Sequence, residues 1–361
     1  MKDISLKALP LKNSIDFKKY SQLLSIIESN DPFHKIGLVF NANSGGERLN
    51  YFLFTINGVP KIIMIFILRN IDIESESTPY KDVISPYGYS GPLISRDTSN
   101  KEVSLFWNAV DNWYKKNNVI TEFIRFSLNN NKREYTGSVI PTLDNVRGVI
   151  LDEKSQWENF DKKVRNNYRK ALKSDLTFKL YYKNITTEIL EDFYHIYNST
   201  MIRRNADSQF FYPFNYFESY VRSNIDNCAI AMTYYNGVSI ATEFLLLSND
   251  TIYSYLGGTN SNYFNARPND FLKVNVLAWG RKLNFNYYLL GGGRINGDQL
   301  YAYKKAFFPK DEDVIFYTGR KIINHDIYNE LLLKTRNTNR ERLKNENESS
   351  TNYFPEYRVG N

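Results

Sequence analysis

Two apolar stretches, each broken by an Asn-Gly pair, predict β-hairpins in the two halves of the chain. The first reads YFLFTINGVPKIIMIFIL over residues 51–68, and the second reads CAIAMTYYNGVSIATEFLLLS over residues 228–248. Asn-Gly favours a type I′ turn, because both residues tolerate positive φ angles. Asn57-Gly58 in the first half therefore corresponds to Asn236-Gly237 in the second.

Each hairpin is followed by the same order of elements, which is a strand with a glycine-rich exit, an amphipathic helix and a further strand. The first copy reads VISPYGYSGPLIS, EVSLFWNAVDNWYKKN and TEFIRFSL, and the second reads TIYSYLGGTNSN, NDFLKVNVLAWGRKLN and NYYLLGGG. This repeat predicts an α/β protein of two tandem units, each with a mixed, largely antiparallel sheet flanked by helices. We place the first unit at 1–150, the second unit with the main site at 151–320, and a polar C-terminal tail at 321–361. We assign no chemistry to the tail, which is either a fraying helix or disordered.

A basic stripe follows the helix that we predict between the two copies, from Ser155 to Ser174. Ser155-x-x-Glu158 has the form of a capping box at its start. The apolar face comprises Trp157, Phe160, Val164, Tyr168 and Ala171, and the basic face comprises Lys162, Arg165, Arg169 and Lys173. This stripe either holds phosphates of a nucleotide or of tRNA, or is only the hydrated face of an amphipathic helix. We assign Arg165, Arg169 and Lys173 to phosphate or donor binding.

Composition and charge narrow the class of protein. Hydrophobic residues make up 42% and charged residues 24% of the 361 positions, as in a folded globular protein. The longest apolar run, Ile62 to Leu68, is far too short to cross a membrane, and the amino terminus has no apolar signal core. We therefore expect a cytoplasmic protein with no transmembrane segment. The net charge of +7 suggests an anionic partner such as a phosphate-bearing substrate or tRNA, without requiring DNA.

Several kinds of catalytic or metal site lack support in the sequence. One cysteine, Cys228, and three scattered histidines provide neither a disulfide nor a common structural zinc site. A P-loop, a G-x-S-x-G elbow and a His-Glu metal motif are all missing from the sequence. Because His34, His195 and His325 have no recognisable partner pattern, a serine or cysteine nucleophile is poorly supported as well.

The segment YLLGGGRINGDQLYAYKKAFFP, residues 288–309, contains the strongest candidate site. Gly291, Gly292 and Gly293 follow a strand end, where α/β folds usually bind ligands, and a bare turn lets backbone N–H groups approach a substrate. The alternative is a tight strand-to-helix connection. We assign these three glycines and the neighbouring Arg294 to substrate binding.

In the helix that follows, the period of 3.6 residues separates two adjacent lysines. Leu300, Tyr303, Lys304 and Phe307 share one side, so Lys304 should turn inward while Lys305 stays in solvent. A lysine on a buried stripe is costly unless its ammonium meets an anion or a pocket, or its stem reaches outward to water. Lys304 is therefore our best single candidate for a functional residue.

Other candidates lie on the second hairpin and its neighbours. Glu243 interrupts the apolar strand ATEFLLL, and is either a base that deprotonates an amine or a structural carboxylate paired with an arginine or at the sheet rim. Tyr253 and Tyr255 share a face of the next strand and either bind substrate or only pack. A helix predicted from about Thr187 ends on Arg203 and Arg204, which either clamp an anion or only suit the helix dipole.

The quoted residues resemble the FemABX-type members of the GNAT-like acyltransferases, in which two GNAT-like units lie in one chain. The resemblance is clearest from Ser155 to Tyr317, through KKVRNNYRKALKS, STMIRRNADSQFFYPFNYF and YSYLGGTNSNYFNARPNDFLKVNVLAWGRKLNFNYYLLGGG followed by DQLYAYKKAFFP. In the first half, SPYGYSGPL is similar to a loop of the family's first unit. The resemblance implies two tandem GNAT-like units.

The resemblance also implies a reaction and a set of site residues. Members transfer an acyl group to an amine, from aminoacyl-tRNA or from an acyl-CoA, with no tightly bound cofactor. The family's aromatic-lysine pair by the reaction centre matches Tyr303-Lys304. Its strand tyrosine near the acceptor matches Tyr253 or Tyr255, and its arginine after the second helix matches Arg203 or Arg204.

The chain departs from the acyl-CoA-dependent GNAT pattern at one place. Those enzymes carry Gln/Arg-x-x-Gly-x-Gly/Ala after the central strand, so that N–H groups at a helix start hold the pyrophosphate. Here the stretch reads GGTNSNYFNARPNDF. The long heptad hairpin that some tRNA-using members carry is also missing from the sequence.

Taken together, the sequence predicts an N-acyltransferase that modifies an amine of a cell-envelope precursor, such as an amino sugar, a nucleotide sugar or a peptidoglycan stem peptide. We expect catalysis from Lys304, Tyr303, Tyr255 and Glu243. The rival hypothesis is a non-catalytic protein that binds RNA or a nucleotide sugar on the same fold. The donor, acyl-CoA or aminoacyl-tRNA, stays open at this point.

Overall fold

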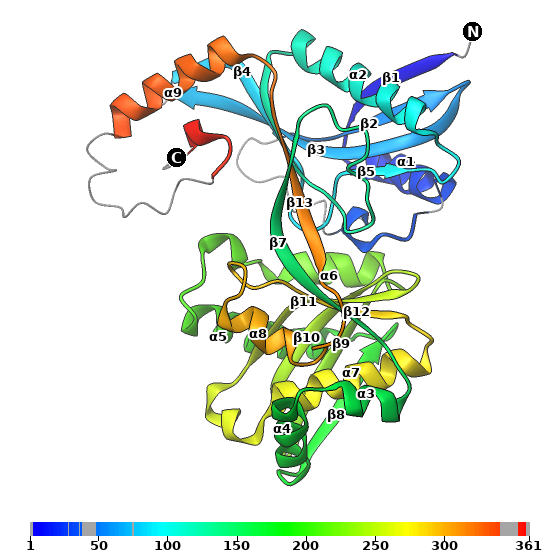
Figure 1. The fold of residues 1–361 in the computed structure, drawn as a ribbon, viewed down its shortest axis with the longest axis vertical. Helices are drawn as coiled ribbons and strands as arrows, with labels where there is room; N and C mark the ends of the chain where they lie inside the picture. Colours follow the sequence, from blue (N-terminus) through cyan, green and yellow to red (C-terminus); the bar gives the residue numbers. More distant parts are fainter. Residues whose placement is uncertain are drawn as a thin grey trace. The chain divides into compact units, whose positions relative to one another are not determined.

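The computed structural model of the chain describes residues 3–27, 29–35, 37, 48–73, 76–339 and 353–358. Its contacts divide the chain into two compact units (Figure 1). Unit 1 comprises Met1–Ser29, Val39–Thr142 and Phe316–Asn361, and unit 2 comprises Asn30–Leu38 and Leu143–Ile315. This differs from the sequence-based division at 150 and 320, because strands β7 (Ser138–Val149) and β13 (Val314–Ile322) each have residues in both units.

Unit 1 is built on a largely antiparallel sheet. Its strand order is β1-β2-β3-β4-β6-β13, with β5 paired to β3, and β4–β6 is the parallel pair. The element bounds are β1 Ile4–Pro10, α1 Ser14–Ile26, β2 Arg48–Ile56, β3 Val59–Ile73, β4 Glu76–Ile84, β5 Pro92–Ile94, α2 Asn100–Lys116, β6 Val119–Arg125, α9 His325–Asn339 and η5 Glu356–Arg358. Helix α2 starts at a capping box between Ser99 and Glu102, and buries Phe106, Trp107 and Val110 in the core of the unit.

Unit 2 repeats this plan. Its strand order is β7-β12-β11-β10-β9-β8, and β11–β12 is the parallel pair. The element bounds are η1 Pro32–His34, α3 Glu153–Asn159, α4 Lys162–Leu172, β8 Leu176–Tyr182, α5 Thr187–Arg203, η3 Ser208–Phe210, α6 Phe214–Ser223, β9 Cys228–Tyr235, β10 Val238–Leu247, β11 Thr251–Thr259, η4 Ser261–Ala266, α7 Pro268–Lys282, β12 Tyr287–Gly291 and α8 Gln299–Lys305.

The internal repeat is confirmed. Both hairpin turns have positive φ angles at both residues, 50° and 76° for Asn57-Gly58 and 50° and 79° for Asn236-Gly237. The order β2-β3-β4-α2-β6 in unit 1 matches β9-β10-β11-α7-β12 in unit 2. The predicted fold class, with mixed and largely antiparallel sheets flanked by helices, is therefore confirmed.

The two faces of the sheet in unit 2 carry different helices. Phe244 of β10 packs on Phe193 of α5 and Phe217 of α6. The preceding residue, Glu243, instead pairs with Lys273 of α7. Because successive side chains of a strand point to opposite faces, α5 and α6 cover one face and α7 covers the other.

The helix predicted from Ser155 to Ser174 is two helices, α3 and α4. The carboxylate of Asp152 accepts a hydrogen bond from the backbone N–H of Ser155, and Asp161 caps α4 through the N–H of Lys163. The capping box at Ser155 was therefore wrong, because an aspartate three residues earlier caps the helix. The predicted apolar face is buried, as Phe160 and Val164 lie in the core of unit 2.

The C-terminal part of the chain belongs to unit 1 as far as it is described. Tyr328 and Leu331 of α9 pack with Tyr357, and the guanidinium of Arg358 pairs with Asp82 at 2.8 Å. This part was predicted as a polar tail from residue 321. Residues 340–352 and 359–361 lie outside the described residues.

Among the helices of the described ranges, none combines the length and the apolar character that crossing a membrane requires.

A buried ion pair ties β13 into unit 1 and yields a first prediction. Lys321 lies 3.1 Å from the fully buried carboxylate of Glu122 and 2.6 Å from Asp111. We expect Lys321→Met to lower the free energy of unfolding by about 3–5 kcal/mol, because it leaves a buried carboxylate without its cation. Chemical denaturation measures this, with Lys334→Met as the control, since Lys334 is 55% exposed in its pair with Glu330. Equal stability of the two variants would contradict the assignment of β13 to the core of unit 1.

Candidate functional site

A buried carboxylate, Glu243, is the centre of a polar cluster between α7 and the sheet of unit 2. It is 4% exposed and accepts from Lys273 Nζ at 2.8 Å, from the Tyr288 hydroxyl at 2.5 Å and from the Ser254 hydroxyl. Burial, and then the charge of Glu243, raise the pKa of Tyr288, so its phenol stays a donor. With three donors around it, Glu243 has the surroundings of a structural carboxylate.

Lys273, the cation in this cluster, was missed by the sequence reasoning, which considered an arginine or a place at the sheet rim for a structural Glu243. Its ammonium is largely buried, with 11% of the side chain exposed. The signal was present, because Lys273 interrupts the apolar face of the helix NDFLKVNVLAWGRKLN. The pairing joins residues 30 positions apart on different elements, which periodicity alone does not give.

Lys304 is turned inward on α8. Its Nζ donates to the carbonyl of Gly292 at 2.6 Å, and Gly292 is the only acceptor for it among the described residues. Burial, and next the positive charge of Lys273, lower the pKa of Lys304 to about 8, against opposing effects of Glu243 and Asp298. The ammonium is therefore mostly protonated at neutral pH and loses its proton a little above it.

Two details of the predicted helix face were wrong. Lys305 does not stay in solvent, because its Nζ pairs with Asp313 at 2.9 Å and donates to the carbonyl of Asp311. Leu300, placed on the inner side, is 44% exposed. The reason is that α8 is only seven residues long, so its first turn lies at the surface.

The glycine turn provides the carbonyl that Lys304 binds, and its glycines also allow close packing. Gly291 has φ of 75°, a conformation that favours glycine. A Cβ on Gly292 would lie 2.4 Å from a methyl carbon of Leu143, and one on Gly293 would lie 2.0 Å from the Asp298 carboxylate. That carboxylate caps α8 through the N–H of Tyr301 and accepts from the N–H of Arg294, whose side chain is exposed. The turn thereby fixes both the start of α8 and the carbonyl that Lys304 binds.

A pocket of about 480 Å³ opens beside Tyr303, between α4, α7 and α8. It is lined by Lys163, Val164, Asn167, Asp270, Gln299, Ala302, Tyr303 and Ala306. The Tyr303 hydroxyl is buried and has no hydrogen-bond partner among the described residues. Burial, followed by the charges of Asp270 and Glu243, raises its pKa. Tyr303 was a predicted site residue, whereas the polar groups that α4 and α7 contribute were missed.

Tyr253 and Tyr255 lie on the other side of the sheet from this pocket. The rings of both contact Phe33, at centroid distances of 5.3 Å and 6.1 Å, and the Tyr255 hydroxyl bonds that of Tyr216 on α6 at 2.6 Å. Ser254, between them, points instead to Glu243. The structure therefore does not bring Tyr255 together with Lys304, Tyr303 and Glu243, which the sequence grouped as catalytic.

The predicted arginines also lie outside the residues that line the pocket. Arg203 donates to the carbonyl of Thr259 at 3.2 Å and stacks over Phe264, and Arg204 is exposed at the end of α5. Arg165 donates to the carbonyls of Phe160 and Glu158 at the end of α3.

The rest of the basic stripe is at the surface. The Arg169 guanidinium lies over the ring of Trp157, and Lys173 is exposed. Within α4, the basic residue that lines the pocket is Lys163, which does not belong to the predicted stripe.

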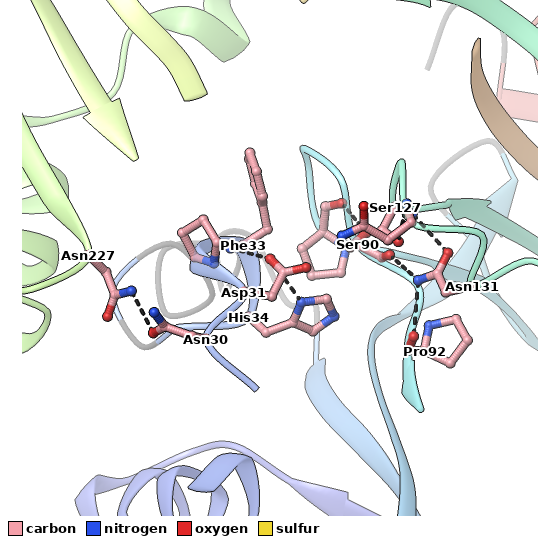
Figure 2. A network of polar contacts seen from close by, with 12 residues as sticks. Asn30, Asp31, Phe33, His34, Ser90, Pro92, Ser127, Asn131 and Asn227 are labelled. Carbon is pink, nitrogen blue, oxygen red and sulfur yellow. Dashed lines mark hydrogen bonds and ion pairs between the residues drawn. The ribbon is translucent and has the colours of Figure 1, made fainter. Parts of the chain in front are cut away.

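The first-unit loop SPYGYSGPL is held by an asparagine that sequence reasoning missed. Figure 2 shows the side-chain amide of Asn131 donating to the carbonyls of Ser90 and Pro92, at 2.8 Å and 3.0 Å, while its oxygen accepts from the N–H of Ser127. Burial raises the pKa of Tyr89 within this loop. These bonds fix the loop as a rigid part of unit 1.

In unit 2, polar side chains contact one another in and just before η1. His34 Nδ1 lies 3.5 Å from the carboxylate of Asp31, and Asn30 accepts from Asn227 at 2.7 Å (Figure 2). Among the described residues, no cluster of three or more metal-binding side chains occurs.

The comparisons with known proteins agree with this geometry. Residues 158–305, which include Glu243, Lys273, Tyr303 and Lys304, match the model of the acetyltransferase (GNAT) domain. Curated proteins give no match to the sequence.

Solved structures extend the likeness to nearly the whole chain. The crystal structure of FemX gives a TM-score of 0.63 at 11% identity, over 91% of this chain and all of that one. A domain described as the C-terminal part of a lysylphosphatidylglycerol synthetase from Agrobacterium fabrum gives 0.57 at 11% identity, over 90% of this chain and 96% of that one. L-PGS from Bacillus licheniformis gives 0.56 at 13% identity, over 88% and 96%. The resemblance read from the sequence is therefore confirmed: residues 158–305 match the acetyltransferase (GNAT) domain model, and the chain shares the fold of FemX.

Proposed function

We propose that the chain is an N-acyltransferase that moves an acyl or aminoacyl group to an amine of a cell-envelope precursor. The GNAT domain and the likeness to FemX and to a lysylphosphatidylglycerol synthetase domain support the reaction class and the envelope link. The observation that carries the proposal is Lys304, a half-buried cation next to Tyr303 on the helix that lines the pocket. We expect the acceptor to be an amino sugar, a nucleotide sugar or a peptidoglycan stem peptide.

In the proposed reaction, Lys304 stabilises the charge that develops on the acyl oxygen. The amine nitrogen attacks the acyl carbonyl carbon, a C–N bond forms, and the C–S bond of a thioester or C–O bond of an ester breaks. Negative charge develops on the carbonyl oxygen during this step, and a preorganised cation stabilises it. One N–H of the ammonium is bound to Gly292, which leaves two for the substrate oxygen.

The start of α7 favours an aminoacyl ester over acyl-CoA as the donor. Its N-cap is Arg267, its first residue is Pro268, which has no N–H, and the buried Asp270 lies in its first turn. A pyrophosphate at a helix start needs free N–H groups and no carboxylate nearby. We therefore place aminoacyl-tRNA first and acyl-CoA second, both as co-substrates available in the cytoplasm.

A transfer assay tests the proposal. The protein is incubated with labelled acetyl-CoA or with charged tRNA, together with a panel of nucleotide-linked amino sugars and wall precursors. We expect the label in an amide of one acceptor, and we expect Lys304→Met to lower turnover by about 100- to 1,000-fold. Salt-dependent RNA binding without transfer to any amine would instead favour the non-catalytic alternative.

The pKa of Lys304 gives a pH prediction. Because the ammonium is the active form, we expect kcat/KM to fall as the pH rises through about 8. Lys304→Arg keeps the positive charge to much higher pH. The kcat/KM of this variant should therefore not fall near pH 8. A wild-type profile that keeps rising above pH 9 would argue against a role for the Lys304 charge.

Lys273 should affect the pH at which kcat/KM falls. Its positive charge lowers the pKa of Lys304, so Lys273→Met should move the falling limb to higher pH. The same variant should lose about 3–5 kcal/mol of stability, because Glu243 is left without its cation. Lys282→Met, an exposed lysine on the same helix, is the matched control and should leave the profile unchanged. If folded Lys273→Met lost activity over the same pH range as the wild type, the effect of the Lys273 charge on the pKa of Lys304 would be contradicted.

A further inference from the structure

Asp270 is a buried carboxylate without a cation. It is 6% exposed in the first turn of α7, and its side chain accepts from the Asn167 amide at 3.1 Å. Among the described residues, no lysine or arginine lies within 4.0 Å of it, although buried carboxylates are normally paired. Arg267, not Asp270, is the N-cap of α7, and it makes no side-chain cap. Asn167 therefore bonds this carboxylate, but no cation at ion-pair distance among the described residues balances its charge.

The same pocket contains another buried polar group, the Tyr303 hydroxyl. Asp270 and Tyr303 both line it, from α7 and α8, and the Tyr303 hydroxyl is buried without a partner. A buried hydroxyl without a partner and a buried carboxylate without a cation both cost free energy, which a ligand in the pocket would recover. The carboxylate can only accept, and the phenol oxygen can accept as well as donate, so a positively charged donor is complementary to both. A primary amine in its ammonium form has this chemistry.

We infer that Asp270 is the catalytic proton acceptor for the attacking amine, and that the Tyr303 hydroxyl binds the same nitrogen. The inference rests on the proposed function and assigns the acceptor amine to this pocket. Lys304, the next residue after Tyr303 on α8, places the carbonyl oxygen of the donor beside it. The pocket thus holds the amine and Lys304 holds the acyl group.

The proton balance of the step is closed. The ammonium gives one proton to Asp270, and the neutral amine attacks the carbonyl carbon. After the C–N bond forms, the nitrogen loses a second proton to the departing oxygen or sulfur, whose bond to carbon breaks. Asp270 then releases its proton to water. The products are an amide, the free hydroxyl or thiol, and one proton.

The charges around Asp270 suit this task. Lys163 of α4 and Tyr303 of α8 line the pocket with it, and Arg267 and Lys273 lie near it on α7. Burial raises the pKa of Asp270 more than the Asn167 hydrogen bond and these two cations lower it, which brings the carboxylate toward the working pH. Lys163 is exposed, so it can meet an anionic part of the acceptor without entering the proton transfer.

Two acceptors that differ in basicity test the inference. An ordinary alkyl amine is protonated at pH 7 and needs a base, whereas hydroxylamine is already neutral and does not. We expect Asp270→Asn to lower kcat/KM by about 100- to 10,000-fold with the alkyl amine acceptor and to change it little with hydroxylamine. Glu188→Gln, which removes an acid from the first turn of α5 outside this pocket, should match the wild type with both acceptors.

Different results would contradict the role of Asp270 and the proposed function. Equal losses with both acceptors, or wild-type activity with both, would overturn the role of Asp270 while leaving the acyltransferase intact. Transfer by neither the wild type nor any variant would contradict the proposed function itself, and this inference with it.

A second variant answers the question if Asp270→Asn does not fold. Tyr303→Phe removes a buried hydroxyl that has no partner, so it should be at least as stable as the wild type. It should raise KM for the alkyl amine by about 2- to 10-fold, the effect of one lost hydrogen bond. An unchanged KM would place the amine outside this pocket.

Discussion

The ion pair between Glu243 and Lys273 is the interaction on which the candidate site depends. It lies between β10 and α7, and the Tyr288 and Ser254 hydroxyls complete its hydrogen bonds. The pair holds α7 to the sheet, and the Lys273 charge lowers the pKa of Lys304 on the neighbouring helix. Burial is the larger cause of that lower pKa and Glu243 opposes it, so Lys273 adjusts the pKa of the residue that we place at the acyl group.

Local features of the chain place a pocket next to this cluster. The Asp298 cap fixes where α8 begins, and the bare Gly292 offers its carbonyl to Lys304. Strands β11 and β12 pair only over 251–253 and 287–289, so the later part of β11 pairs with β10 alone. Parting strands of this kind are where α/β sheets bind ligands. The pocket beside Tyr303 is then a consequence of the fold rather than of one loop.

The sequence predicts what periodicity and turn chemistry control. Both Asn-Gly hairpins, the repeated order of elements and the inward turn of Lys304 followed from such local patterns. Contacts between distant segments did not follow: Lys273 opposite Glu243, and Tyr255 on the far face of the sheet. Arg165 was expected to bind phosphate, but the break after α3 gives it carbonyls to cap. Strand register and helix breaks decide such positions, and neither is a property of a single segment.

The ionisation of Lys304 is the most direct measure of this account. With lysine side chains labelled with ¹³C, an NMR titration follows each ε-carbon, and Lys304→Arg identifies the resonance of residue 304. We expect this lysine to titrate with a pKa of about 8. Titration of Lys304 near about 10.4, the value of a freely hydrated lysine, would contradict the buried site that the account requires.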